Sequence, residues 1–364
     1  MRPPHSLALL VPAILLGLIV GCGPKGGGGG GGAGQRVTMD AGGATFVQPI
    51  MAFWTDEYRE RTSEKVKVNY QGTGSSDGIK KMTSKEFAFG CSDAPMSKKE
   101  LDDATANGGP VIHIPLVVGA VVPVYHLDGL DKPLVFTGPL LADIFLGKVK
   151  KWNDPAVAAL NPAAKLPDLD IQPVFRSEGS GTSYVFSEYL SKVSDEFKSK
   201  VGATKAFPDK VGVGKKGSEG VAGHIASTKG AIGYIELTYA LDTKATFGSV
   251  RNKAGKDVLA DLPSVTAAVL AGMELKQTVT PYDLHDLTYN LTDLPGDAVY
   301  PITATSFCLI YKKQPKDRGQ ALVEFLKWAT SPEGQKMSEN RNYAALPGKL
   351  REKIADKLGT VEFE

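Results

Sequence analysis

Residues 176–183, with the sequence RSEGSGTS, place a permanently charged arginine beside small hydroxyl side chains and glycines. An apolar run follows directly, so the Gly-Ser-Gly-Thr part is expected to open a helix. The first N–H groups of a helix lie unpaired at the positive end of its dipole, and a guanidinium holds two oxygens at once, so the segment can bind a tetrahedral oxyanion. Ordinary N-capping by Ser180 or Thr182 explains the same residues equally well. Arg176 would then be solvated or paired with Glu178.

Strand and helix patterns alternate along the body of the chain. Alternating or apolar runs predict strands at 37–41, 65–70 and 87–91. A further strand at 171–175 leads directly into Arg176. This alternation indicates an α/β fold with a largely parallel sheet, and ligands of such sheets bind at the carboxyl ends of the strands. The oxyanion segment therefore lies where a ligand is expected.

Three other loops at predicted strand ends carry groups suited to an oxyanion. The first has Thr45 and the Phe46 amide, the second has Ser75 and Ser76, and the third has Asp93. Asp93 is the informative residue, because a carboxylate repels a fully ionised anion and accepts a hydrogen bond from a ligand that still carries a proton. This selects hydrogenphosphate over sulfate, which has no hydrogen to offer.

The composition limits the classes of function. The chain has 364 residues, of which 42% are hydrophobic, enough for two domains of ordinary size or one large one. Its formal net charge of +2 argues against a nucleic-acid binder, so any anion recognition must be local. No cysteine and histidine cluster has metal-ligand spacing, so we expect no metal site and no cofactor. Cys91 and Cys308 can form two buried thiols or one disulfide, and we favour two thiols.

Residues 1–22 have the pattern of an export signal. The apolar stretch at 7–20 is too short to span a membrane comfortably, and the Ile-Val-Gly-Cys that ends at Cys22 matches a lipobox. We expect acylation of this cysteine, which becomes the mature N-terminus; a plain secretory signal with an incidental cysteine is the alternative. Residues 23–35, which include seven consecutive glycines at 26–32, predict a flexible tether. The sequence therefore predicts an exported lipoprotein, periplasmic or on the cell surface.

Four other segments carry weaker signals. The apolar run at 111–124 contains two prolines, which favour consecutive buried strands with a crossover near 116–120 over a membrane helix. Residues 300–311 predict a strand pair. Residues 212–217 match GxGxxG formally, but no solid strand precedes them, as a dinucleotide site requires. The charged stretch at 243–292 has no assignment.

Several of these segments together are similar to the periplasmic phosphate-binding proteins of bacterial high-affinity phosphate uptake systems. The similarity covers nearly all of residues 36–346 and is carried by residues 44–46, 74–76, 89–95, 146–152, 176–183, 230–234 and 301–305. The family implies a two-domain, Venus-flytrap fold of the type II periplasmic binding proteins, with the ligand cleft between the domains. Such a protein is a monomeric binding protein and not an enzyme. It closes on one phosphate and delivers it to the permease subunits of an ABC transporter.

The resemblance also implies a ligand set and domain limits. Carried onto this chain, the phosphate-binding residues are Thr45, Phe46, Ser75, Asp93, Arg176, Ser180, Gly181 and Thr182. Domain I would comprise residues 36–116 and 300–364, and domain II residues 117–299. Two departures from the family pattern are Glu178, where an aspartate is common, and Cys91, where an alanine is common. Whether the longer Glu178 orients the arginine is therefore open, whereas Cys91 is expected to serve core packing.

Other classes of function fit parts of the sequence. Residues 74–78 match GxSxG, the nucleophile elbow of serine hydrolases, which would make Ser76 the nucleophile of an esterase or phosphatase. A base would have to come from His126, His224 or His285, none of which has a recognisable active-site context. A binder of another tetrahedral oxyanion, such as arsenate or sulfate, and a tethered phosphate sensor are the remaining alternatives.

Overall fold

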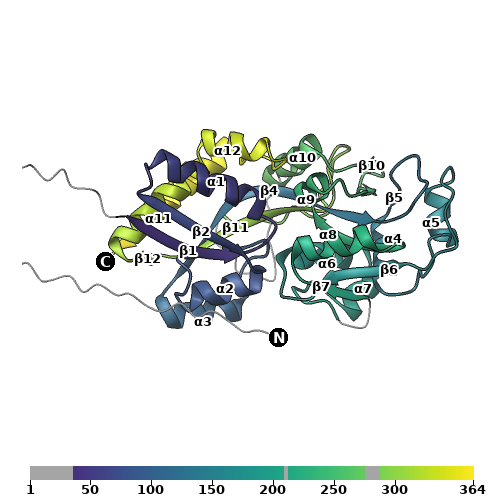
Figure 1. Cartoon of the computed structure of the whole chain (residues 1–364), viewed down its shortest axis with the longest axis horizontal. Coiled ribbons are helices and arrows are strands. Elements are labelled where there is room, and N and C mark those ends of the chain that lie inside the picture. The colour runs from purple at the N-terminus through teal and green to yellow at the C-terminus, as the bar shows by residue number, and fades with distance from the viewer. Residues whose placement is uncertain (1–35, 209–211, 275–286) are drawn as a thin grey trace, which may run out of the picture. The chain divides into compact units, whose positions relative to one another are not determined.

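A mixed eight-stranded sheet runs through the part of the chain that the computed structural model describes, which is residues 36–208, 212–274 and 287–364. The order of its strands is β2-β1-β3-β11-β4-β8-β6-β7 (Figure 1). These strands are β1 (Val37–Gly43), β2 (Val66–Gly72), β3 (Phe89–Ser92), β4 (Val111–Tyr125), β6 (Gln172–Arg176), β7 (Val213–Lys215), β8 (Ala231–Glu236) and β11 (Thr303–Tyr311). Two small sheets are formed by β5 (Val135–Phe136), β9 (Ser249–Arg251) and β10 (Asp257–Val258), and by β12 (Lys313–Gln314) and β13 (Glu362–Phe363).

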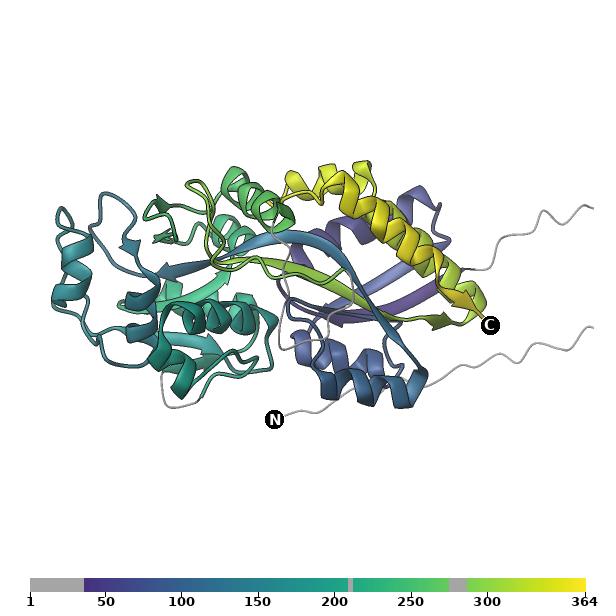
Figure 2. The ribbon, with the colours of Figure 1, turned by 180° about the vertical axis from the view of Figure 1, so that it is seen from behind.

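Helices separate most of the strands along the chain, so the predicted α/β alternation is confirmed. They are α1 (Gln48–Arg61), α2 (Ser75–Thr83), α3 (Lys98–Gly108), α4 (Gly138–Phe145), α5 (Pro155–Leu160), α6 (Gly181–Val193), α7 (Asp195–Lys200), α8 (Gly217–Ser227), α9 (Leu237–Asp242), α10 (Leu262–Glu274), α11 (Lys316–Ala329), α12 (Pro332–Glu339) and α13 (Gly348–Gly359). In Figure 2 the C-terminal helices, in yellow, lie on one side of the first strands, and α2 and α3, in blue, lie on the other.

The pairing directions correct the expectation of a largely parallel sheet. β1 is parallel to β2 and β3, and β6 is parallel to β7 and β8. β11 is antiparallel to β3 and β4, and β4 is antiparallel to β8. Strand and helix alternation predicts which segments are strands, but it does not show that β11, from the far end of the chain, inserts between β3 and β4.

Strands β4 and β11 correct two further expectations. β4 is one continuous strand of 15 residues, all of them buried, and not two strands with a crossover near 116–120. Residues 300–311 contribute the single strand β11 in place of the expected pair. A proline lacks the N–H that a sheet ladder needs, so prolines normally interrupt a strand. In β4 an irregularity in the register accommodates one of them.

The register between β4 and β11 shifts by one residue. Ser306 lies opposite Val117, whereas Phe307 lies opposite Pro115. Leu116 is therefore an extra residue in β4, a bulge of the kind that bends a strand and redirects its side chains. The parallel strands form two groups, β1 to β3 and β6 to β8. The bulge lies in the stretch of β4 on which these two groups converge.

The carboxyl ends of these two groups point at the same part of β4. β3 ends at Ser92, opposite Phe307 of β11, and runs in the direction of β4. β8 ends at Glu236, opposite Val121 of β4, and runs the other way. Because β1 is parallel to β3 and β6 is parallel to β8, the loops after all four strands approach β4 near residues 116–120. Figure 2 shows β4 and β11 passing side by side from one group to the other.

Two more sequence interpretations are resolved by the structure. Cys91 and Cys308 are buried free thiols at paired positions of β3 and β11, as favoured. Residues 212–217, which match GxGxxG, contain the strand β7. They do not form the phosphate-binding loop that a dinucleotide site places after a strand. Gly212 is needed there for packing, because a Cβ would lie 2.0 Å from the Pro173 carbonyl oxygen.

Part of the unassigned stretch at 243–292 forms β9, β10 and α10. The expected export signal at 1–22, its Cys22 and the tether at 23–35 lie outside the described residues. Within the described ranges, no helix has the length and apolar character needed to cross a membrane.

Candidate anion-binding site

Two helices begin at the point where the strand ends converge. α2 begins at Ser75, and α6 begins at Gly181. The Gly181 N–H donates to Ser75 Oγ at 3.0 Å, and the Ser76 N–H donates to the Gly179 carbonyl at 3.0 Å. The positive ends of two helix dipoles therefore meet here, an arrangement that favours an anion beside them.

Glycines allow this close approach. A Cβ on Gly181 would lie 2.5 Å from Ser75 Oγ and 2.7 Å from the Asp93 nitrogen. A Cβ on Gly179 would lie 2.1 Å from a hydroxyl of α2. Gly74, directly before α2, has a φ of +95°, which a residue with a side chain rarely adopts. The glycines of the two loops are thus required by geometry.

Ser180 and Thr182 have different roles in the structure. Ser180 Oγ accepts the Ser183 N–H at 3.2 Å, so the capping interpretation holds for this residue. Thr182 Oγ1 instead donates to Asp93 Oδ2 at 3.3 Å. Ser180 and Thr182 are each 1% exposed, so both hydroxyls lie inside the site.

Arg176 enters the site from the end of β6 and is buried. Its Nε donates to Glu178 Oε1 at 2.8 Å, and its Nη2 contacts the same oxygen. Glu178 Oε1 also accepts the Gly217 N–H at 3.1 Å. The longer carboxylate therefore does orient the arginine. The remaining nitrogen, Nη1, lies 3.5 Å from Ser218 Oγ.

Thr45 and Phe46 lie between β1 and α1. Thr45 Oγ1 lies 2.9 Å from Ser218 Oγ, so Ser218 links this loop to Arg176. The Phe46 carbonyl accepts a hydrogen bond from the Tyr343 hydroxyl at 2.6 Å, and the Phe46 ring is fully buried. These contacts fix the turn that carries the Phe46 N–H.

Asp93 follows β3 and is 4% exposed. Its Oδ1 accepts the Ser306 hydroxyl at 2.8 Å, and its Oδ2 accepts the Thr182 hydroxyl at 3.3 Å. Burial raises the pKa of Asp93 to about 7, although both hydroxyls and Arg176 act to lower it. A carboxyl group that titrates near neutrality can exchange a proton with an anion that is itself partly protonated.

Sequence reasoning missed three residues of the site. Ser218 follows Gly217 in the first turn of α8, and a small hydroxyl residue after a glycine at the start of a helix is a local signal for such a site. Tyr234 supports α6, because its hydroxyl lies 2.7 Å from Ser183 Oγ and its ring stacks on Phe186 at 4.4 Å. Ser306 reaches the carboxylate from β11. No local signal identifies Ser306, because its role depends on pairing between distant strands.

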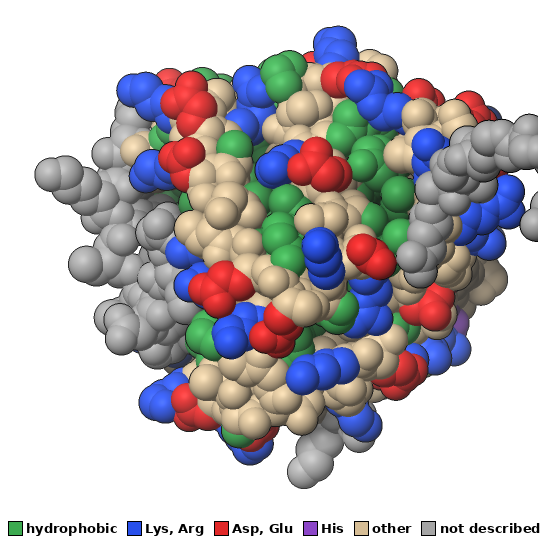
Figure 3. Space-filling model, turned by 90° about the vertical axis from the view of Figure 1, so that its left-hand side faces the viewer, with side chains coloured by type: hydrophobic (Ala, Val, Ile, Leu, Met, Phe, Trp, Pro, Cys, Tyr) green, Lys and Arg blue, Asp and Glu red, His purple; other side chains and the backbone are tan. Residues whose placement is uncertain are grey.

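The positive charge of Arg176 is offset within the site. Arg176 is paired with Glu178, so helix N-termini and hydroxyls must supply much of the attraction for an anion. On the face shown in Figure 3, basic and acidic side chains are intermingled, as the formal net charge of +2 leads one to expect. Anion recognition on this protein is therefore a property of the local site.

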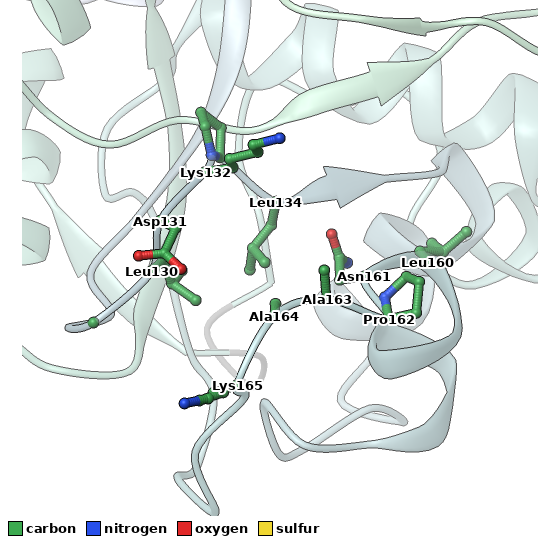
Figure 4. Close-up of a pocket in the computed structure, with 12 residues that line it drawn as sticks. Leu130, Asp131, Lys132, Leu134, Leu160, Asn161, Pro162, Ala163, Ala164 and Lys165 are labelled. Atoms are coloured by element: carbon green, nitrogen blue, oxygen red, sulfur yellow. The ribbon is translucent and has the colours of Figure 1, made fainter.

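A separate pocket of about 440 Å³ lies between the loops at 129–134 and 160–165. None of the predicted site residues lines it. The Asn161 side chain is already hydrogen-bonded to the backbone of Val135 and Val157. Figure 4 shows that the amino groups of Lys132 and Lys165 lie well apart. The pocket therefore lacks converging groups for an anion.

Neither of the two candidate bases that the structure describes, His126 and His224, completes a hydrolase site around Ser76. His126 Nδ1 lies 3.1 Å from a backbone carbonyl, and His224 Nε2 lies 2.9 Å from Gln172 Oε1. His285 lies outside the described residues. The described contacts thus give no support to a serine nucleophile.

The chain is similar in sequence to a known protein family and to individual members of it. A family model described as the PBP superfamily domain matches residues 30–333. The phosphate-binding protein PstS of Xylella fastidiosa (strain 9a5c) is 41% identical over 323 residues, which cover 88% of this chain and 84% of that protein. The phosphate-binding protein PstS of Methanocaldococcus jannaschii is 34% identical over 344 residues, which cover 91% of this chain and 87% of that protein.

Solved structures show the same fold. The high-affinity periplasmic phosphate-binding protein PfluDING, bound with phosphate, has a TM-score of 0.69 at 19% identity and covers 88% of this chain and 93% of its own. The phosphate-binding protein of Stenotrophomonas maltophilia has a TM-score of 0.64 at 17% identity, with coverage of 88% and 94%. The predicted two-domain fold of the periplasmic binding proteins is thereby confirmed. The chain belongs to the PstS family of phosphate-binding proteins within the PBP superfamily.

Proposed function

We propose that this protein binds hydrogenphosphate at the candidate anion site and delivers it to the permease of an ABC-type phosphate importer. The observation that carries the proposal is the buried carboxylate of Asp93, set beside Arg176 and the N-termini of α2 and α6. The names of the relatives support the choice of ligand, since proteins 34% and 41% identical to this chain are phosphate-binding proteins.

The proposed ligand set surrounds the phosphate with donors from both groups of strands. It consists of the hydroxyls of Thr45, Ser75, Ser180 and Thr182, the N–H groups of Phe46 and Gly181, the guanidinium of Arg176, and the carboxylate of Asp93. Several of these groups bond one another in the structure, as the Gly181 N–H and the Ser75 hydroxyl do. Phosphate would replace such contacts with bonds to its own oxygens, so that the buried donors stay paired.

Asp93 would supply the discrimination between anions. In its ionised form it accepts the proton of hydrogenphosphate, whereas sulfate presents only unprotonated oxygens. Two negatively charged oxygens facing each other in a buried site are strongly unfavourable, so sulfate is rejected. Arsenate, which has the geometry and protonation of phosphate, would be accepted.

The proposed domain limits place residues 36–116 and 300–364 in domain I and residues 117–299 in domain II. Strand pairing supports this division, because β3 pairs with β11 while β8 pairs with the last residues of β4. α2 would then belong to domain I and α6 to domain II. Opening of the cleft would bend β4 and β11 near the bulge and separate the two helix N-termini.

The proposed place of action is outside the cytoplasmic membrane, in the periplasm or on the cell surface. The expected export signal at 1–22 and acylation of Cys22 support it. A glycine-rich tether of about a dozen residues reaches roughly 20 Å, which would hold a monomer near its permease.

Isothermal titration calorimetry tests the proposed ligand. The purified protein, freed of phosphate by exhaustive dialysis, is expected to bind one phosphate per chain with high affinity. Absence of binding at millimolar phosphate would refute the proposal.

A further inference from the structure

We infer that Ser306 is a positioning residue, which holds Asp93 so that one carboxylate oxygen faces the ligand and thereby sets the selectivity between hydrogenphosphate and sulfate. This inference rests on the proposed phosphate-binding function. Ser306 lies on β11, 213 positions from Asp93 along the chain. It is not among the ligands that the family resemblance implies.

The strand register brings Ser306 to this place. Phe307 of β11 lies opposite Ser92 of β3, so the next antiparallel pair is Ser306 with Asp93. The Ser306 hydroxyl donates to Asp93 Oδ1 at 2.8 Å, and Ser306 is fully buried. The register shift between β4 and β11 falls directly after Ser306. Bulges beside functional sites commonly redirect side chains in this way.

The two oxygens of Asp93 face different parts of the molecule. Oδ1 meets Ser306 within the sheet, whereas Oδ2 meets Thr182 in the first turn of α6. The bond from the sheet keeps the carboxylate from turning, so Oδ2 is the oxygen presented to the ligand. The contact of Oδ2 with Thr182, at 3.3 Å, is the longer one and the one that a ligand can replace.

The titratable groups around Asp93 come from several elements. Arg176 of β6 favours its ionised form. Tyr70 of β2 also faces this region, and the thiols Cys91 and Cys308 lie behind Asp93 on β3 and β11. Burial raises the pKa values of Tyr70 and Cys308, so both stay uncharged at neutral pH. A hydroxyl donor from β11 therefore matters for keeping the carboxylate ionised.

Loss of the Ser306 hydroxyl would leave Asp93 Oδ1 buried without this donor. The ionised form becomes less favourable, so the pKa of Asp93 rises further. A protonated Asp93 donates a hydrogen bond where the ionised form accepts one, and sulfate can use that donor. Because sulfate does not titrate near neutrality, the pH dependence of sulfate binding reports the protonation of Asp93 directly.

Calorimetric titration of sulfate into the wild-type protein, Ser306→Ala and Ser306→Thr, from about pH 5 to about pH 9, tests this role. In the wild type, sulfate affinity is expected to fall as the pH rises through the pKa of Asp93. In Ser306→Ala the fall should come about one pH unit higher, because a hydrogen bond to a charged group changes an equilibrium about tenfold or more. Ser306→Thr keeps the hydroxyl and should keep the wild-type profile.

Two results would overturn the role of Ser306. One is a Ser306→Ala protein whose sulfate affinity depends on pH as that of the wild type does. The other is a Ser306→Thr protein whose profile is shifted as far as that of Ser306→Ala, which would indicate an effect of packing alone. If the alanine variant does not fold, Ser306→Cys replaces it, and an unshifted profile there also overturns the inference. Failure of the wild type to bind phosphate refutes the proposed function itself. Normal phosphate binding by the wild type, together with an unshifted sulfate profile in Ser306→Ala, refutes only the role of Ser306.

Discussion

Replacing Gly181 with alanine is expected to keep α6 from closing against α2. The added Cβ would lie 2.5 Å from Ser75 Oγ and 2.7 Å from the Asp93 nitrogen, whereas ordinary contacts lie at 3.4–4 Å. The Asp93 nitrogen belongs to the backbone, so it cannot move aside by a change of rotamer. α6 must therefore shift by roughly one ångström in a closely packed region.

The size of the effect follows from the proposed ligand bonds that this shift would weaken. The Gly181 N–H and the Thr182 hydroxyl, which bond Ser75 and Asp93 in the structure, would both be drawn away from the phosphate. A hydrogen bond to a charged group is worth about 1.5–3 kcal/mol. Weakening these two bonds by about 2–4 kcal/mol in all corresponds to roughly 30- to 1000-fold weaker phosphate binding.

Calorimetric titration of phosphate into the wild type, Gly181→Ala and Gly223→Ala measures this effect. Gly223 is the matched control, because it lies within α8 and a Cβ there meets no atom within 4 Å. Its replacement should leave phosphate affinity unchanged and stabilise the fold by about 0.5–1 kcal/mol. Phosphate affinity of Gly181→Ala within about threefold of the wild type would refute the view that α2 and α6 close on the ligand.

Two further predictions concern carboxylates, one partly buried and one fully buried. Glu178→Ala should weaken phosphate binding about ten- to hundredfold, because Arg176 loses the acceptor that orients it, while Glu178→Gln keeps an oxygen and should lose less; equal losses in calorimetry would contradict this. Burial raises the pKa of Glu236 from 4.5 to about 8, although bonds from Thr238 and Tyr343 lower it. The folded protein thus holds this proton more tightly than the unfolded chain does, and the resulting stability is full below pH 4.5 and lost as the pH rises through about 8. Glu236→Gln should remove that loss, roughly 3–5 kcal/mol in the free energy of unfolding from urea titrations, and an unchanged pH slope would count against it.

Local patterns in the sequence predict much of the candidate site. Thr45, Ser75, Asp93 and Arg176 each follow a recognisable strand, and the carboxyl ends of strands are where ligands gather in α/β sheets. The structure brings these loops together at β4. Glycine-rich loops that open helices are equally local signals, which is why the segment at 176–183 stands out without any knowledge of the fold.

The missed features depend on contacts between distant segments. The apolar pattern of β11 shows that it is buried, but it does not show that Ser306 pairs with Asp93. The prolines of β4 suggest an interruption, because a sequence does not reveal that a bulge at Leu116 absorbs one of them. Ser218 bridges Thr45 and Arg176 only after two separate groups of strands have met.

The most direct test of the account compares phosphate and sulfate binding to the wild type and to Asp93→Asn at about pH 8, with the pH chosen above the pKa of Asp93 of about 7. The wild type should prefer phosphate by about a hundredfold or more, because only about a tenth of Asp93 is then protonated for sulfate, while phosphate gains a hydrogen bond to the ionised carboxylate that is worth a further tenfold or more. Asp93→Asn removes the negative charge and should bring the two affinities within about tenfold of each other. Comparable phosphate and sulfate affinities in the wild type, or a full preference for phosphate retained in Asp93→Asn, would contradict the account.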